Sequence, residues 1–178
     1  MCARKPPPDA PDAFDSTFEA LLGGGLPWLA ELHLQEAGFA YQDSAIAEEH
    51  LYQAGLIAPG HAAVLIAYYR YYFYKGRIKE AIDIALLCLE KAALENALPL
   101  DWRKIEMGMA AFGSYEAIKP RFLMFSLKAY AYLLLRQGYR IEAMTALIKL
   151  LELDPTDKIG AKLLMDIAAR DAAEGEDE

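Results

Sequence analysis

A six-residue pattern that occurs twice constrains the fold of this chain more than any other feature. Residues 76–81 read Gly-Arg-Ile-Lys-Glu-Ala, and residues 138–143 read Gly-Tyr-Arg-Ile-Glu-Ala. Each copy follows an aromatic-rich helical stretch and precedes an apolar helical stretch. Glycine favours the left-handed turn that ends a helix, and the small alanine lets the next helix pack closely. The pattern therefore predicts two points at which one helix ends and the next packs against it.

Two prolines place these segments in a common register. Segments 54–59 and 150–155 both close an amphipathic helix and end in proline, which stops one helix and can begin another. Pro59 lies 17 residues before Gly76, and Gly138 lies 17 residues before Pro155. A proline-to-glycine interval and a glycine-to-proline interval together make 34 residues, a period that is typical of a helical repeat.

The period and its motifs resemble the tetratricopeptide repeat (TPR) family. This resemblance implies an all-α, right-handed solenoid of helical hairpins, with repeats at about 28–61, 62–95 and 124–157 and a capping helix at 157–171. Tyr69 occupies a position where the family prefers a small residue, so we expect the second helix pair to be splayed or rearranged there. The third repeat has the clearest match, at Leu127, Tyr130, Ala131, Leu134, Gly138, Ala143, Leu147, Leu150 and Pro155.

The segments outside the repeats complete the predicted organisation. Residues 14–22 are expected to form a short helix. Residues 96–123 interrupt the register, and we expect one short helix near 101–107 and an ordered loop that packs on the repeats, because Trp102, Phe112 and Tyr115 favour burial. The predicted domains are a disordered, proline-rich tail at 1–13, a single helical domain at 14–171 and an acidic tail at 172–178.

The charge distribution excludes some partners. The net charge of −8 argues against a nucleic-acid-binding protein, which must neutralise phosphates. Residues 59–151 carry a balance of +5, whereas residues 1–58 carry −7 and residues 152–178 carry −6. This pattern predicts either internal charge pairing or an acidic partner for the middle of the chain. No apolar run is long enough to cross a membrane and no signal segment follows the N-terminus, so we expect a cytoplasmic protein.

No arrangement of residues indicates catalysis or metal binding. His33, His50 and His61 do not have the spacing of a helical zinc motif, and we expect His61, at a helix start, to face solvent or cap the helix. The sequence has no phosphate-binding loop and no nucleophile motif. Of the two cysteines, Cys88 is expected to be a small core residue. We therefore expect no metal, no cofactor and no enzymatic activity.

The most unusual local feature is a run of six aromatic rings within residues 68–74. In TPR proteins one face of each first helix lines a concave groove, and the resemblance assigns Ile66 and Phe125 to that face. The cations and rings of this face suit partner binding, since rings supply contact area and cations recognise carboxylates. The predicted groove residues are Arg70, Phe73, Tyr74, Lys128, Tyr132 and Arg136.

Two alternatives to groove binding remain. The rings could simply pack in the core, and the insertion could fill the groove from within. The carboxylate clamp of some TPR proteins, which uses two asparagines, is absent: the corresponding residues are Ala67, Arg70, Ala129 and Tyr132.

These observations favour a protein-binding adaptor or assembly factor that holds a peptide or helix of another protein. One alternative is a specialised chaperone for apolar client segments, similar to the small acidic TPR chaperones of type III secretion. Another is a structural module that self-associates as a homodimer. The Tyr-rich helix followed by Leu-Pro-Leu-Asp-Trp at 98–102 also resembles small TPR proteins that accompany bacterial nitrogen-fixation genes.

Overall fold

A computed structural model of the chain describes residues 24–175. Within this range the chain forms seven α-helices, one short 3-10 helix and no strands, which confirms the all-α prediction. The predicted tail at 1–13 and helix at 14–22 lie outside the described residues. The helices are α2 (Trp28–Phe39), α3 (Ser44–Ile57), α4 (Ala62–Tyr74), α5 (Ile78–Glu95), the 3-10 helix η1 (Trp102–Lys104), α6 (Ile118–Arg136), α7 (Arg140–Leu153) and α8 (Ala161–Gly175).

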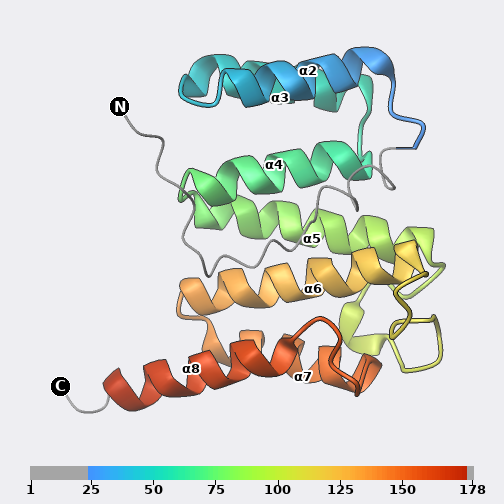
Figure 1. Cartoon of the computed structure of the whole chain (residues 1–178), viewed down its shortest axis with the longest axis vertical. Coiled ribbons are helices and arrows are strands. Elements are labelled where there is room, and N and C mark those ends of the chain that lie inside the picture. Colours follow the sequence, from blue (N-terminus) through green and yellow to red (C-terminus); the bar gives the residue numbers. More distant parts are fainter. Residues whose placement is uncertain (1–23, 176–178) are drawn as a thin grey trace.

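The helices form a stack in chain order. Each of α2, α4, α5, α6 and α7 packs on the helix that follows it, while α3 makes a smaller contact with α4. Figure 1 shows α2 and α3 as the outermost layer at one end of the stack and α7 and α8 at the other. No helix of the described range combines the length and apolar content that crossing a membrane requires.

The two copies of the repeated pattern form the same turn. Gly76 has a φ of 73° and Gly138 a φ of 81°, in the left-handed region that glycine enters without a steric penalty. The next residue in each copy donates its backbone N–H across the turn, from Arg77 to the carbonyl of Tyr72 and from Tyr139 to that of Leu134, both at 2.9 Å. These bonds satisfy carbonyls that the helix end would leave unpaired. The predicted function of both glycines as helix terminators is confirmed.

The insertion is shorter than predicted because α6 begins at Ile118, six residues before the expected start of the third repeat. Pro120 does not prevent this, since the first-turn N–H groups of a helix have no intrahelical acceptor. The short helix expected near 101–107 is only the single 3-10 turn η1. The loop packs on the main helical core through the buried rings of Trp102 and Phe112, whereas the prediction that Tyr115 is covered was wrong.

The C-terminal helix also differs from its predicted bounds. α8 begins at Ala161 rather than 157, because the Asp157 carboxylate accepts hydrogen bonds from the backbone N–H groups of Ala161 (2.6 Å) and Lys162 (3.2 Å). Such a carboxylate satisfies the unpaired donors at a helix start. The helix extends to Gly175, into the predicted acidic tail, and it contacts α7 and α6.

The N-terminal hairpin is attached to the stack by small apolar clusters. The main core extends from Ala62 in α4 to Leu164 in α8, whereas α2 and α3 meet in two separate clusters. Alanines that are buried between these two helices let their backbones approach closely. On the α4 side the two clusters contain Val64 and Tyr71. The hairpin is therefore held to the rest of the protein by less buried apolar surface than joins the other helices.

Candidate functional site

A pocket of about 750 Å³ lies between the N-terminal hairpin and α4. Its wall is mainly apolar, with a few polar groups, which is the usual character of a protein binding site. Two of the predicted groove residues, Arg70 and Tyr74, contribute to it. The lining residues are Leu26, Glu31, Leu34, Gln35, Ala37, Gly38, Tyr41, Leu51, Ala63, Ala67, Arg70, Tyr71 and Tyr74.

Two aromatic rings that line this pocket contact each other and the ammonium group of Lys75. The rings of Tyr41 and Tyr71 meet edge to face, with their centroids 6.1 Å apart. The Lys75 ammonium lies 4.4 Å from the centroid of the Tyr41 ring and 5.6 Å from that of Tyr71. Burial raises the pKa of Tyr41 and of Tyr71, so both hydroxyls keep their protons at neutral pH. The Lys75 ammonium therefore lies over neutral rings, and the faces of such rings attract a cation electrostatically.

Three other predicted residues form a cluster that continues from the pocket toward α6. The Phe73 ring lies 5.3 Å from the Tyr74 ring and 6.0 Å from the Tyr132 ring, between centroids. The Arg136 guanidinium donates to the Tyr132 hydroxyl at 3.4 Å, and its carbon lies 5.9 Å from the centroid of that ring. Five of the six predicted residues are thus connected in space, from Arg70 to Arg136.

Lys128, the sixth predicted residue, has a different environment. Its ammonium donates a hydrogen bond to the backbone carbonyl of Ile159, in the loop before α8. Burial lowers the pKa of Lys128, although the negative charge of Asp157 partly offsets the effect. Ile66, which the resemblance also assigned to the groove face, is completely buried in the main core. Lys128 therefore contacts the loop before α8 and is not part of the cluster that connects Arg70 to Arg136.

The α2 side of the pocket was missed at the sequence level. Glu31, Leu34, Gln35 and Gly38 line the pocket from one face of this helix. Their i, i+3, i+4 and i+7 spacing is the signal that could have indicated a shared face. The resemblance gave no indication of this face, because its groove residues were assigned in the second and third repeats alone.

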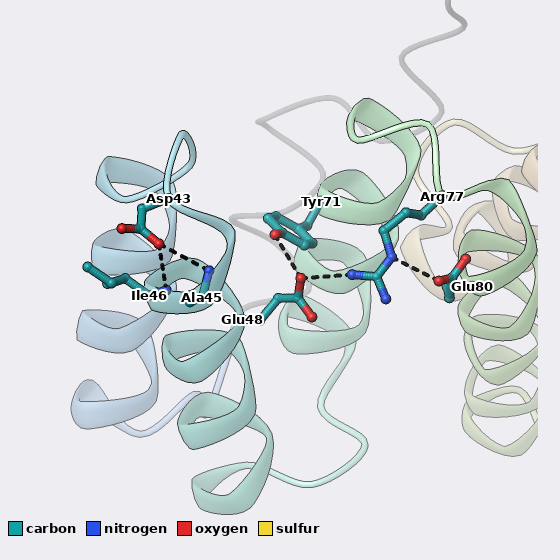
Figure 2. Close-up of polar contacts among 7 residues, drawn as sticks. All are labelled: Asp43, Ala45, Ile46, Glu48, Tyr71, Arg77 and Glu80. Atoms are coloured by element: carbon teal, nitrogen blue, oxygen red, sulfur yellow. Dashed lines mark hydrogen bonds and ion pairs between the residues drawn. The ribbon is translucent and has the colours of Figure 1, made fainter.

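A polar network holds the hairpin beside the pocket. Figure 2 shows Glu48 of α3 accepting hydrogen bonds from the Tyr71 hydroxyl (3.1 Å) and from Arg77 (2.7 Å), which also pairs with Glu80 at 2.8 Å. These hydrogen bonds and ion pairs raise the pKa of Arg77 and lower that of Glu80. Asp43 starts α3 by accepting hydrogen bonds from two backbone N–H groups. The network joins the hairpin to both α4 and the start of α5.

The described histidines interact with each other and with the backbone. The Nδ1 atoms of His33 and His50 lie 2.9 Å apart across α2 and α3, a hydrogen bond in which one ring donates and the other accepts. His61 caps α4 by accepting from the Ala63 N–H at 3.2 Å, which confirms its predicted position at a helix start. Among the residues that the structure describes, no three side chains of the metal-binding types gather at one place.

Comparison with known proteins identifies a relative of this chain. The chain is 36% identical over 129 residues to a protein of Azotobacter chroococcum mcd 1 described as "Uncharacterized 19.8 kDa protein in nifW 5'region", and the match covers 72% of each chain. No protein-family model matches the chain, so the tetratricopeptide assignment stays a prediction. No solved structure matches it.

Proposed function

Because this chain belongs to the same family as the 19.8 kDa protein of the Azotobacter chroococcum nifW 5' region, we propose that it is a nitrogen-fixation-associated adaptor or assembly factor that binds another protein. It uses a TPR-like solenoid as its scaffold and has no catalytic activity of its own. The bound element is a peptide or helix of the partner, held in the pocket between α2 and α4. The genomic position of the relative supports the association with nitrogen fixation, and the pocket supports the binding of a partner segment.

The observation that carries this proposal is the pocket of about 750 Å³ with its adjoining aromatic cluster. Arg70 and Tyr74 lie in the pocket, and Phe73 connects them to the Tyr132–Arg136 pair. Rings provide rigid contact area at low entropic cost, and arginine recognises carboxylates with two parallel hydrogen bonds. An apolar partner segment that carries acidic residues fits this chemistry.

The proposal is tested by capture from extracts of nitrogen-fixing and non-fixing cells, followed by titration of the purified captured protein. The test variant is Arg70→Glu/Tyr74→Ala, which reverses one charge and removes one ring at the pocket. The matched control is Lys104→Glu/Tyr115→Ala, which makes the same two changes at exposed positions of the insertion. Circular dichroism verifies that both variants keep their helices.

We expect the pocket variant to weaken binding of the captured protein at least about tenfold, as loss of a central anchor does, and the control to bind normally. Equal binding by both variants would place the interaction elsewhere on the molecule. Preferential capture of many unfolded proteins would instead indicate the chaperone alternative.

A further inference from the structure

The outward face of α2 carries large apolar side chains that nothing in the described chain covers. Trp28 is 73% exposed, Leu32 is 40% exposed and Phe39 is 84% exposed. Their spacing places all three within one face of the helix, and Leu29 adjoins them. This face adjoins the pocket: Gln35, which lines the pocket together with Glu31, Leu34 and Gly38, has helical spacing to Leu32 and Phe39.

This apolar face lies at the end of the stack, where a polar surface is expected. In stacked-helix proteins the outer face of the terminal unit is normally polar, because it meets water. Here α2 belongs to the outermost layer (Figure 1), and α3 adds Ile46, Tyr52 and Leu56 as further exposed apolar residues. Contiguous exposed apolar surface with a polar rim marks a site of association.

The charges around this face indicate the kind of occupant. Residues 24–69 contain five acidic side chains and no lysine or arginine. One of the five, Glu48, is paired with Arg77, while Glu31, Glu36 and Glu49 are exposed on the hairpin. Glu31 and Glu36 therefore flank the apolar face by helical spacing, and the hairpin carries no lysine or arginine of its own, although Arg70 of α4 lines the same pocket as Glu31. This balance favours a positively charged partner.

The same charges disfavour the two occupants that the chain itself could supply. A second copy that met this face with its own hairpin would bring the same acidic residues into contact, and like charges across an interface cost free energy. The segment 14–22 has apolar residues but carries Asp15 and Glu19 and no basic residue. Neither occupant provides charge complementarity.

We infer that the outward face of α2 is a docking surface for a basic amphipathic helix of another protein. The apolar side of that helix covers Trp28, Leu32 and Phe39, and its flanking lysines or arginines lie beside Glu31, Glu36 and Glu49. Amphipathic helices commonly bind apolar surfaces in this way. The surface adjoins the pocket at Gln35 and provides a second attachment point beside it.

The test uses the full-length chain and a synthetic peptide as the probe. The peptide has about 18 residues, enough for five helical turns, with leucines on one face and lysines elsewhere. A second peptide has glutamate in place of every lysine. Binding is followed by labelled-peptide anisotropy and by tryptophan fluorescence, since Trp28 is exposed whereas Trp102 is buried.

We expect the lysine peptide to bind and the glutamate peptide not to bind. Trp28→Ala/Phe39→Ala should weaken peptide binding at least about tenfold. Glu36→Lys/Glu49→Lys should also weaken peptide binding, and the loss of affinity should be larger at low salt than at high salt. The matched control is Leu163→Ala/Ile167→Ala, which removes two exposed apolar residues of α8 and should leave affinity unchanged. Equal affinity in the α2 variant and this control overturns the inference.

Two further measurements decide between occupants. Sedimentation of the wild type as a dimer that dissociates in the Trp28→Ala/Phe39→Ala variant would assign the face to a second copy and overturn the inference. A gain of at least about tenfold in peptide affinity on Phe18→Asp/Leu22→Asp would show that the chain's own N-terminal segment occupies the face. That result would also overturn the inference. A monomeric wild type, together with a peptide affinity that Phe18→Asp/Leu22→Asp leaves unchanged, supports an external partner. Because none of these variants alters the pocket, the results are independent of the proposed function.

Discussion

The carboxylate of Glu48 and the guanidinium of Arg77 lie 2.7 Å apart and connect the N-terminal hairpin to the turn between α4 and α5. Both side chains are 38% exposed. Tyr71, which lines the pocket, donates its hydroxyl to the same carboxylate oxygen. The hairpin meets α4 through small apolar clusters, and this ion pair is a further link between the hairpin and the rest of the stack.

Replacement of Arg77 by methionine should loosen the hairpin without unfolding the protein. Because the pair is partly exposed, its loss should reduce the free energy of unfolding by less than about 1 kcal/mol. Backbone amides of α2 and α3 should exchange with deuterium about three to five times faster, since local opening depends on local contacts. The matched control is Arg103→Met, which removes a similar ion pair with Glu142 on α7. Equal acceleration throughout the chain would show that the hairpin is not a separate unit.

Lys128→Met should destabilise the protein rather than impair partner binding. The substitution keeps the apolar stem and removes the ammonium that donates to the Ile159 carbonyl. Loss of a partly buried, charge-assisted hydrogen bond costs about 1–2 kcal/mol, measured by urea unfolding. Lys104→Met, at an exposed position, serves as the control. Unchanged stability together with weaker partner binding would return Lys128 to the groove as originally predicted.

Gly76 and Lys128 differ in whether their structural roles could be predicted from the neighbouring sequence. A glycine that must adopt a positive φ is identifiable from its position between two periodic segments, and both repeated turns were predicted correctly. Lys128, Tyr132 and Arg136 share a helical face by spacing alone. Lys128 could reach solvent or hydrogen-bond the carbonyl of Ile159, which lies 31 residues further along the chain. The path of the last loop decides between the two, and the spacing of residues within one helix does not predict that path.

The aromatic run in α4 shows a similar limit. Six rings in seven residues surround the helix, so periodicity cannot separate core from groove. The structure buries Tyr69 in the main core, where its ring stacks on Phe73 with centroids 6.0 Å apart, and α4 and α5 remain packed. The exposed Tyr74 instead borders the pocket, whose opposite wall comes from α2. That pairing follows from tertiary packing and not from the run itself.

Cys88 should react with thiol reagents only when the protein unfolds. Its side chain is fully buried in α5, and burial raises the pKa of the thiol to about 12. At pH 8 only about one thiol in ten thousand would then be ionised, and the thiolate is the reactive form. A Cys2→Ser variant leaves Cys88 as the single thiol to be measured with iodoacetamide. The rate should rise with urea in parallel with unfolding. Rapid labelling under native conditions, comparable with that of the denatured chain, would contradict this packing.

Asp154, in the loop between α7 and α8, should make the stability of the protein depend on pH. Burial alone would raise the pKa of this carboxyl, but hydrogen bonds from Thr156 and from the backbone N–H of Lys158 outweigh that effect and lower it. A lowered folded-state pKa means that the stabilisation is fully present above the unfolded value of about 4 and is lost as the pH falls through the folded value.

Asp154→Asn should therefore cost about 1–3 kcal/mol near pH 7, because an amide N–H would face the Lys158 N–H. The difference from the wild type, measured by urea unfolding, should shrink as the pH falls below the unfolded value of about 4. Asp43→Asn is the matched control and should stay near wild-type stability at pH 7, since asparagine caps a helix about as well as aspartate. A difference for Asp154→Asn that is constant from pH 7 to about pH 3 would show that the carboxylate charge does not hold the loop.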